Sequence, residues 1–132
     1  MATLNTFTIV GGLTADPEVR FNTNGKAMAT FTIASSERSY DRERNEWVEK
    51  STLYMRCVLW GKAAENVAET LRKGDRVIAT GTLVASSYTD RDGNKRTSTE
   101  MRVEEVGPSL LFKTYKATET GAPRQYDAPP AS

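Results

Sequence analysis

The sequence contains no histidine and a single cysteine, Cys57. Without histidine, Ser-His-Asp and Cys-His catalytic sites are excluded, and ordinary zinc sites lack their ligands. A lone cysteine also excludes a disulfide within the chain, which is typical of a reducing cytoplasm. The residue types therefore favour a binding protein without a cofactor over an enzyme. Carboxylate-bound metals and a lysine mechanism remain the open routes to catalysis.

An excess of positive charge is also missing, since 18 Lys and Arg stand against 17 Asp and Glu in 132 residues. A protein that holds a polyanion by charge alone is therefore disfavoured, and a nucleic-acid site would depend on local charge or on uncharged contacts. No apolar run approaches the roughly 20 residues of a membrane span. The N-terminus carries no secretory signal pattern, so we expect a cytoplasmic protein.

The residues that are present favour β-structure over most of the chain. β-branched and aromatic residues predict strands at residues 4–13, 26–35, 52–60, 76–88 and 95–106, with turn residues between them. Residues 109–112, after Pro108, are a candidate for a further short strand. One helix is predicted at residues 62–73, where Ala64, Val67, Ala68 and Leu71 recur at helical spacing and Gly74 follows.

Three strands, a helix and two strands are the element order of the five-stranded OB-fold barrel. The predicted fold is therefore all-β, with one helix between the third and fourth strands and a long hairpin after it. Gly81 and the pair Gly11-Gly12 fall where barrel strands must bend. An open α+β sheet has the same elements and is the alternative.

The chain divides into two parts by composition. Residues 1–112 hold most of the β-branched and aromatic residues and are expected to form the OB-fold binding domain. Residues 113–132 are polar and hold three of the five prolines, so we expect a flexible C-terminal tail.

The predicted strand at residues 52–60 suggests a binding surface. Its odd positions from Leu53 to Leu59 are all apolar, whereas Tyr54, Arg56, Val58 and Trp60 alternate with them on the other face. A base stacked on an aromatic ring contributes roughly 1–3 kcal/mol, and every base has a face that can stack. The alternative is a strand buried on both sides, which the arginine disfavours because burying an unpaired charge is costly.

Two predicted hairpins carry further candidates. Tyr88 stands beside the turn at Asp90–Gly93, where Arg91, Lys95 and Arg96 are candidates for phosphate contacts; a merely solvated hairpin is the alternative. Residues 37–50 mix both charges and contain two rings. Tyr40 is the better candidate for stacking. Trp47 is ambiguous, and the favoured interpretation is that it packs back on a strand.

No metal site is predicted. Asp90, Asp92 and Gly93 resemble part of a calcium loop, but the loop is too short and indicates a turn instead. Glu100, Glu104 and Glu105 are interpreted as a solvated strand face.

Several segments resemble the bacterial single-stranded DNA-binding protein (SSB) family. Residues 11–20 (GGLTADPEVR) resemble its opening motif and residues 25–34 its second strand. Residues 60–65, 73–75, 81–83 and 88–93 follow in the family's order, so the resemblance covers residues 1–112. Residues 106–112 look most like actinobacterial or actinophage members.

The resemblance implies an OB-fold subunit, usually a homotetramer, that binds single-stranded DNA without sequence preference. It also implies roles in replication, recombination and repair, with nucleoid association in the cytoplasm. Its stacking rings would fall on Tyr40, Tyr54, Trp60 and Tyr88. We expect phosphate contacts from Arg20, Arg38, Arg56, Lys62, Arg72, Arg91, Lys95 and Arg96.

Three departures from the family's pattern are visible. Tyr40, Tyr54 and Tyr88 stand where many members have tryptophan, a change that preserves stacking. Gly12 stands where Arg or Asn is common, so one phosphate contact is absent. The family's principal members end in an acidic tail with a Pro-Phe tip that recruits replication and repair proteins, whereas residues 127–132 read DAPPAS. The sequence therefore gives no support for such partners. Two alternatives remain, an RNA-binding OB module and an OB-fold protein-interaction subunit.

Overall fold

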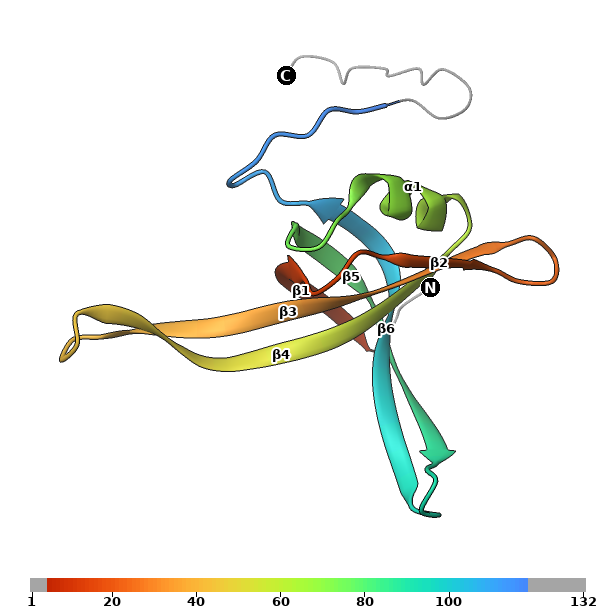
Figure 1. Cartoon of the computed structure of the whole chain (residues 1–132), viewed down its shortest axis with the longest axis horizontal. Coiled ribbons are helices and arrows are strands. Elements are labelled where there is room, and N and C mark those ends of the chain that lie inside the picture. Colours follow the sequence, from red (N-terminus) through yellow and green to blue (C-terminus); the bar gives the residue numbers. More distant parts are fainter. Residues whose placement is uncertain (1–4, 119–132) are drawn as a thin grey trace.

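The computed structural model describes residues 5–118; the predictions for residues 1–4 and for most of the expected tail, 119–132, lie outside the described residues. Within them the chain forms one helix and six strands (Figure 1). In chain order these are β1 (Thr6–Leu13), β2 (Glu18–Phe21), β3 (Ala27–Asp41), β4 (Glu46–Trp60), α1 (Lys62–Thr70), β5 (Arg76–Thr89) and β6 (Lys95–Pro108).

Five of these strands close into a barrel. The sheet order is β1-β5-β6-β4-β3-β2, and β1 returns to pair with β3 through Gly12 opposite Ala34 and Leu13 opposite Ile33. This closure confirms the predicted OB-fold barrel and excludes the open sheet. The short β2, which the sequence analysis took for a connection, adds to the edge of β3. The strand proposed at residues 109–112 does not form.

Period-two alternation defines the core in β3. Ala27, Ala29, Phe31 and Ile33 are buried, and the residues between them are only partly covered. The single cysteine belongs to this core. Cys57 is fully buried, and burial raises the pKa of its thiol to about 12, so it acts as a small apolar side chain.

The strands β3 and β4 run far beyond their predicted ends at residues 35 and 52. They remain paired out to Asp41 opposite Glu46 and form the long arm at the left of Figure 1. Polar residues fill this part of the hairpin, so no core periodicity marked it as strand. The paired backbones satisfy one another's hydrogen bonds even where no core lies beneath them.

The helix ends earlier than predicted, at Thr70 instead of residue 73. Ala64 and Val67 are buried as expected. Leu71 is also buried, but its backbone is extended, because the chain already turns towards β5 there. Gly74 completes that turn with φ +89°, a conformation in which glycine meets no steric penalty. No helix in the described part of the chain is long and apolar enough to cross a membrane.

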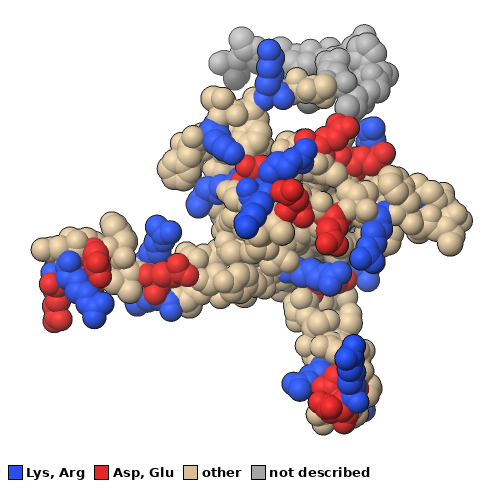
Figure 2. All heavy atoms as spheres, in the orientation of Figure 1, with Lys and Arg blue, Asp and Glu red and all other residues tan. Residues whose placement is uncertain are grey.

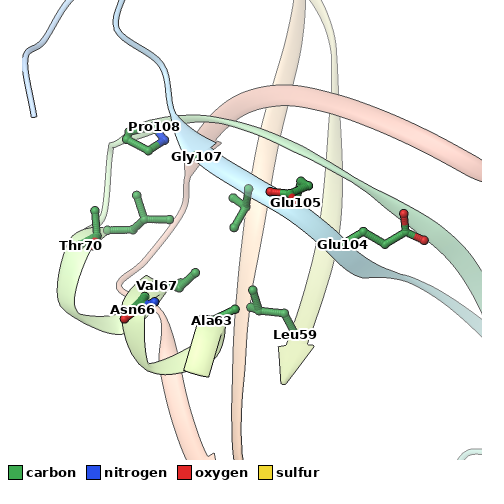
Figure 3. Close-up of a pocket in the computed structure, with 11 residues that line it drawn as sticks. Leu59, Ala63, Asn66, Val67, Thr70, Glu104, Glu105, Gly107 and Pro108 are labelled. Atoms are coloured by element: carbon green, nitrogen blue, oxygen red, sulfur yellow. The ribbon is translucent and has the colours of Figure 1, made fainter. Parts of the chain in front are cut away.

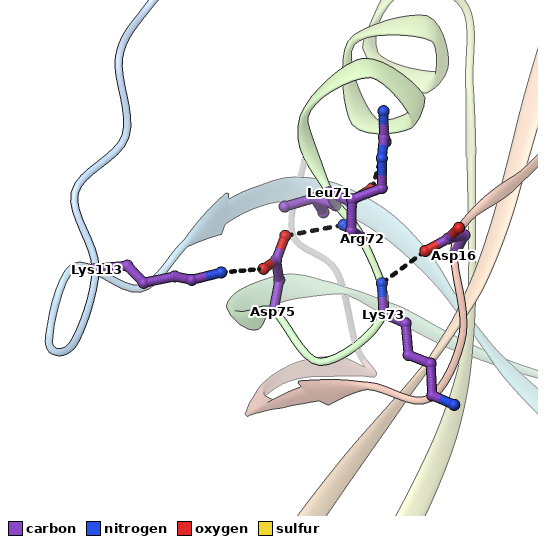
Figure 4. A network of polar contacts seen from close by, with 6 residues as sticks. All are labelled: Asp16, Leu71, Arg72, Lys73, Asp75 and Lys113. Atoms are coloured by element: carbon purple, nitrogen blue, oxygen red, sulfur yellow. Dashed lines mark hydrogen bonds and ion pairs between the residues drawn. The ribbon is translucent and has the colours of Figure 1, made fainter.

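A buried carboxylate organises this turn. Asp75 is 5% exposed and accepts hydrogen bonds from the backbone N–H of Arg72 and from Lys113 Nζ, both at 2.8 Å (Figure 4). Lys113 lies beyond β6, so the ion pair ties the segment after the barrel to the start of β5. The hydrogen bond from Lys113, followed by that from Arg72, lowers the pKa of Asp75.

This lowered pKa predicts a pH-dependent stability. A carboxyl whose folded pKa lies below its unfolded pKa stabilises the fold above the unfolded value, about 3.9, and loses that contribution as the pH falls through the folded value. We expect Asp75→Asn to lower the free energy of unfolding at pH 7, and the difference from wild type to shrink between about pH 5 and pH 2. Urea titrations across this range measure it; a difference independent of pH would contradict the assignment.

Candidate nucleic-acid interface

The outer face of β4 presents two aromatic rings with a guanidinium between them. Tyr54 is 66% exposed and Trp60 is 46% exposed, and the side chain of Arg56 is also exposed. Since Met55, Cys57 and Leu59 point into the core, a strand buried on both sides is excluded. The alternation is imperfect: Val58 is buried on the outer face, and Leu53 is exposed where β4 leaves the barrel.

The neighbours of Trp60 come from two other strands. Its cross-strand partner is Met28 on β3, which in turn pairs with Arg20 on β2. Lys26 Nζ lies 5.8 Å from the centroid of the Trp60 ring, within the range of a cation–π contact. Sequence spacing does not reveal Lys26, because only the strand register brings it to the ring. A positive charge therefore stands beside the stacking candidate.

Arg56 lies where three strands meet. It pairs with Thr32 on β3 and with Glu100 on β6, and its Nε lies 3.9 Å from Glu100 Oε2. A polar hollow of about 220 Å³ adjoins it, lined mainly by threonines and by Asp16 and Glu18. The guanidinium is therefore available at the surface, but one carboxylate competes for it.

We expect Glu100→Gln to tighten oligo-dT binding. The substitution removes a negative charge beside Arg56 and keeps the size of the side chain, so a phosphate meets less competition. Because the pair is exposed, the gain is modest, about two- to fivefold at low salt, and it diminishes as salt rises. Fluorescence titrations at two salt concentrations measure it. Weaker binding by Glu100→Gln would show that the carboxylate positions Arg56 instead of competing for it.

The β5–β6 hairpin carries a second group of predicted residues. Tyr88 is 53% exposed, and Arg91 and Lys95 are exposed beside it. Asp90 accepts hydrogen bonds from two backbone N–H groups of its own turn and from Arg96 Nε at 2.8 Å. The bond from Arg96 lowers the pKa of Asp90. The turn interpretation is thus confirmed, and Arg96 is partly engaged within the hairpin.

The remaining predicted residues lie in three other places. Tyr40, 46% exposed, and Arg38 belong to the outer part of the β3–β4 hairpin. Lys62 begins α1, two residues after Trp60. Arg72 follows the other end of α1, where its Nη1 donates to the carbonyl of Ala68 and to that of Leu71, the latter seen in Figure 4. The structure therefore brings Tyr54, Arg56 and Trp60 together on β4, but not Arg72 with them.

Charge is mixed on both hairpins. Figure 2 shows Lys and Arg interspersed with Asp and Glu at the end of each arm, without a continuous basic track on the visible face. Among residues 5–118, no three His, Cys, Asp or Glu come together as a metal site. Such a surface suits ring stacking supported by a few cations better than binding by bulk charge.

A separate cavity of about 240 Å³ lies between α1 and the end of β6 (Figure 3). Apolar residues such as Leu59 and Val67 line most of it, and Glu104 and Glu105 belong to its β6 side. None of the predicted stacking or phosphate-contacting residues reaches it. Two carboxylates also disfavour a phosphate there, so this cavity is not part of the candidate interface.

The closed five-stranded barrel defines an OB-fold protein, and β4 presents exposed rings on its outer face. The model of the single-strand binding protein family matches residues 4–109. The chain belongs to this family.

Its relatives include actinobacterial proteins. The single-stranded DNA-binding protein of Paenarthrobacter aurescens is 50% identical over 120 residues, covering 91% of this chain and 70% of the relative. That of Mycobacterium tuberculosis H37Rv is 51% identical over 119 residues, covering 90% and 73%. The small single-stranded DNA-binding protein of Streptomyces coelicolor has a similar structure, with a TM-score of 0.71 and 24% identity over 83% of this chain and 97% of that one. This structural likeness supports the fold.

Proposed function

We propose that the chain binds single-stranded DNA without sequence preference and protects it during replication, recombination and repair. The observation that carries the proposal is the outer face of β4, where the exposed rings of Tyr54 and Trp60 flank Arg56. Neither ring is committed to the core, so each has a face open to a base. Family membership supports the same conclusion.

In this mechanism bases stack on Tyr40, Tyr54, Trp60 and Tyr88, while cations meet the phosphates. Arg20, Arg38, Arg56, Lys62, Arg91 and Lys95 are exposed and suited to that role. Arg72 and Arg96 remain in the proposal; each donates from one guanidinium nitrogen to the protein and keeps its other N–H groups for a phosphate. Stacking reads no base edge, which explains why the proposed binding is independent of sequence.

The wider proposals follow from the family. The chain would act as a cytoplasmic, nucleoid-associated homotetramer without enzymatic activity, with residues 1–112 as its DNA-binding domain. Light scattering with and without oligo-dT tests the subunit count. Because no catalytic role is proposed for Glu104 and Glu105, their mutation should leave DNA binding unchanged.

A competition assay tests the function directly. Labelled oligo-dT is bound first, and unlabelled oligo-dT, oligo-U or duplex DNA of the same length is then added. We expect oligo-dT to compete best and duplex DNA least, because paired bases offer no free face for stacking. Better competition by oligo-U would favour the RNA-binding module. No binding, and no quenching of tryptophan emission by DNA, would favour the protein-interaction subunit.

A further inference from the structure

Trp47 is the most exposed ring on β4, and it does not belong to the core of the barrel. Its side chain is 68% exposed, and it contacts Tyr40 edge-on, with ring centroids 5.5 Å apart and planes at 63°. Packing back on a strand is the interpretation of Trp47 that the sequence favours, without excluding others. Its exposure shows that it is instead presented to solvent with its cross-strand partner.

Sequence spacing alone would place Trp47 on the wrong face. Tyr54 and Trp60 are both even-numbered and share the outer face of β4, whereas an odd-numbered residue belongs to the opposite face of a regular strand. A β-bulge changes this parity. Glu37 pairs with Ser51 but Arg38 pairs with Glu49, so Lys50 is an extra residue in β4.

The register beyond the bulge fixes the new face. Strand β3 has no extra residue, so Ala34 and Tyr40 lie on the same side of it, and they pair with Tyr54 and Trp47 respectively. Cross-strand partners share a face of the sheet. Trp47 therefore lies on the face that carries Tyr54.

Contacts next to the bulge agree with this placement. Thr52 lies within hydrogen-bonding distance of Ser36, its cross-strand partner, at 3.1 Å between the hydroxyl oxygens. The same Thr52 hydroxyl donates to Glu49 on the far side of the bulge. Thr52 and Glu49 would lie on opposite faces of a regular strand. They meet on one face here because Lys50, the extra residue, lies between them.

The end of the hairpin holds the two rings in place. Asp41 Oδ1 accepts the backbone N–H groups of Glu43 and Arg44 at 3.0 and 3.3 Å, and this closes the turn. Asn45 adopts φ +53°, and its side-chain oxygen accepts a hydrogen bond from the Tyr40 hydroxyl at 3.4 Å. These contacts orient the Tyr40 ring, against which Trp47 lies, before any ligand arrives, which lowers the entropy lost on binding.

We propose that Trp47 is a fifth base-stacking ring and that the bulge at Lys50 turns it onto the face of Tyr54 and Trp60. The inference rests on the proposed binding of single-stranded DNA. It extends the path of the bound DNA from the barrel to the end of the β3–β4 hairpin. Along β4 the rings are roughly 20 Å apart, so successive rings would hold bases several nucleotides apart.

The chain offers a direct test because it contains two tryptophans, Trp47 and Trp60. Trp60→Phe leaves Trp47 as the only tryptophan, and Trp47→Phe leaves Trp60, while both variants keep a ring at each site. Each is titrated with poly-dT, binding is followed by the anisotropy of labelled DNA, and tryptophan emission is recorded. We expect emission to be quenched in both variants.

The outcomes separate this inference from the proposed function. If Trp60 emission is quenched while Trp47 emission stays unchanged at saturation, the inference is wrong and the proposed function stands. If neither variant binds DNA, both are wrong. Emission of Trp47 that shifts with protein concentration before DNA is added would also overturn the inference, because the ring would then be a contact between copies.

Affinity provides a second measurement. We expect Trp47→Ala to weaken poly-dT binding about tenfold and Trp47→Phe to retain most of the affinity. The salt dependence should not change, since no cation is removed. Val48→Ala is the matched control, because Val48 is the next residue on the opposite face. An equal loss in Val48→Ala would assign the effect to the hairpin's structure and contradict stacking.

Discussion

Trp60→Ala is expected to weaken oligo-dT binding by roughly 1–3 kcal/mol, which corresponds to about 5- to 150-fold in the dissociation constant. The ring is 46% exposed at the end of β4, so its loss removes a stacking surface without opening the core. Lys26 also loses the ring that it lies over, but remains available to a phosphate. Because alanine removes one of the two tryptophans, the measurement uses the anisotropy of labelled oligo-dT.

Two variants control this experiment. Trp60→Phe keeps an aromatic face and should retain most of the affinity. Phe21→Ala removes an aromatic side chain that is 63% exposed. Phe21 pairs with the core-facing Ala27 and so does not share the face of Trp60. The affinity of this variant should therefore equal that of wild type. A folded Trp60→Ala protein with unchanged affinity would refute this part of the site.

Gly81→Ala is expected to destabilise the fold by roughly 2–4 kcal/mol. Gly81 lies at the β-bulge where β5 crosses β6, and a Cβ there would lie 2.0 Å from the carbonyl oxygen of Arg102. That atom belongs to the backbone, so relief requires the two strands to separate. The bulge also directs the hairpin that carries Tyr88, and the variant should therefore bind DNA less tightly even where it folds.

Gly107→Ala provides the matched control on the partner strand. A Cβ at Gly107 meets nothing within 4 Å, and its φ is not in the left-handed region. The free energy of unfolding should then lie within about 1 kcal/mol of wild type, since the alanine restricts the unfolded chain without straining the folded one. Urea denaturation of both variants gives the comparison. Equal midpoints for Gly81→Ala and wild type would show that the bulge tolerates a side chain.

The barrel was predictable because its burial follows simple periods. Alternation in residues 52–60 identified the buried face of β4, and Gly81 marked the place in β5 opposite the bulge, whose extra residue, Glu104, belongs to β6. The helix was recognised from its apolar stripe, but its end was not. Leu71 continues the stripe from an extended backbone, because the chain must turn there to enter β5, and side-chain spacing does not report that turn.

The sequence could group residues of the candidate binding surface only where they lie on the same strand. Tyr54, Arg56 and Trp60 could be grouped from their spacing, whereas Lys26 and Glu100 depend on how β3 and β6 align with β4. Trp47 depends on an extra residue in a polar hairpin, where no apolar pattern reveals a change of parity. Arg72 stays a predicted phosphate contact, and spacing could not show that its Nη1 donates to the carbonyls of Ala68 and Leu71 at the end of α1.

In the proposed mechanism, exposed rings hold the ligand more than charge does. The most direct measurement compares oligo-dT with an abasic deoxyribose-phosphate oligomer of the same length, titrated into the wild-type protein at low and moderate salt. Both ligands carry the same phosphates, but only one carries bases. We predict that oligo-dT binds much more tightly at both salt concentrations and that only oligo-dT quenches tryptophan emission. Equal affinity for the two oligomers would contradict the account.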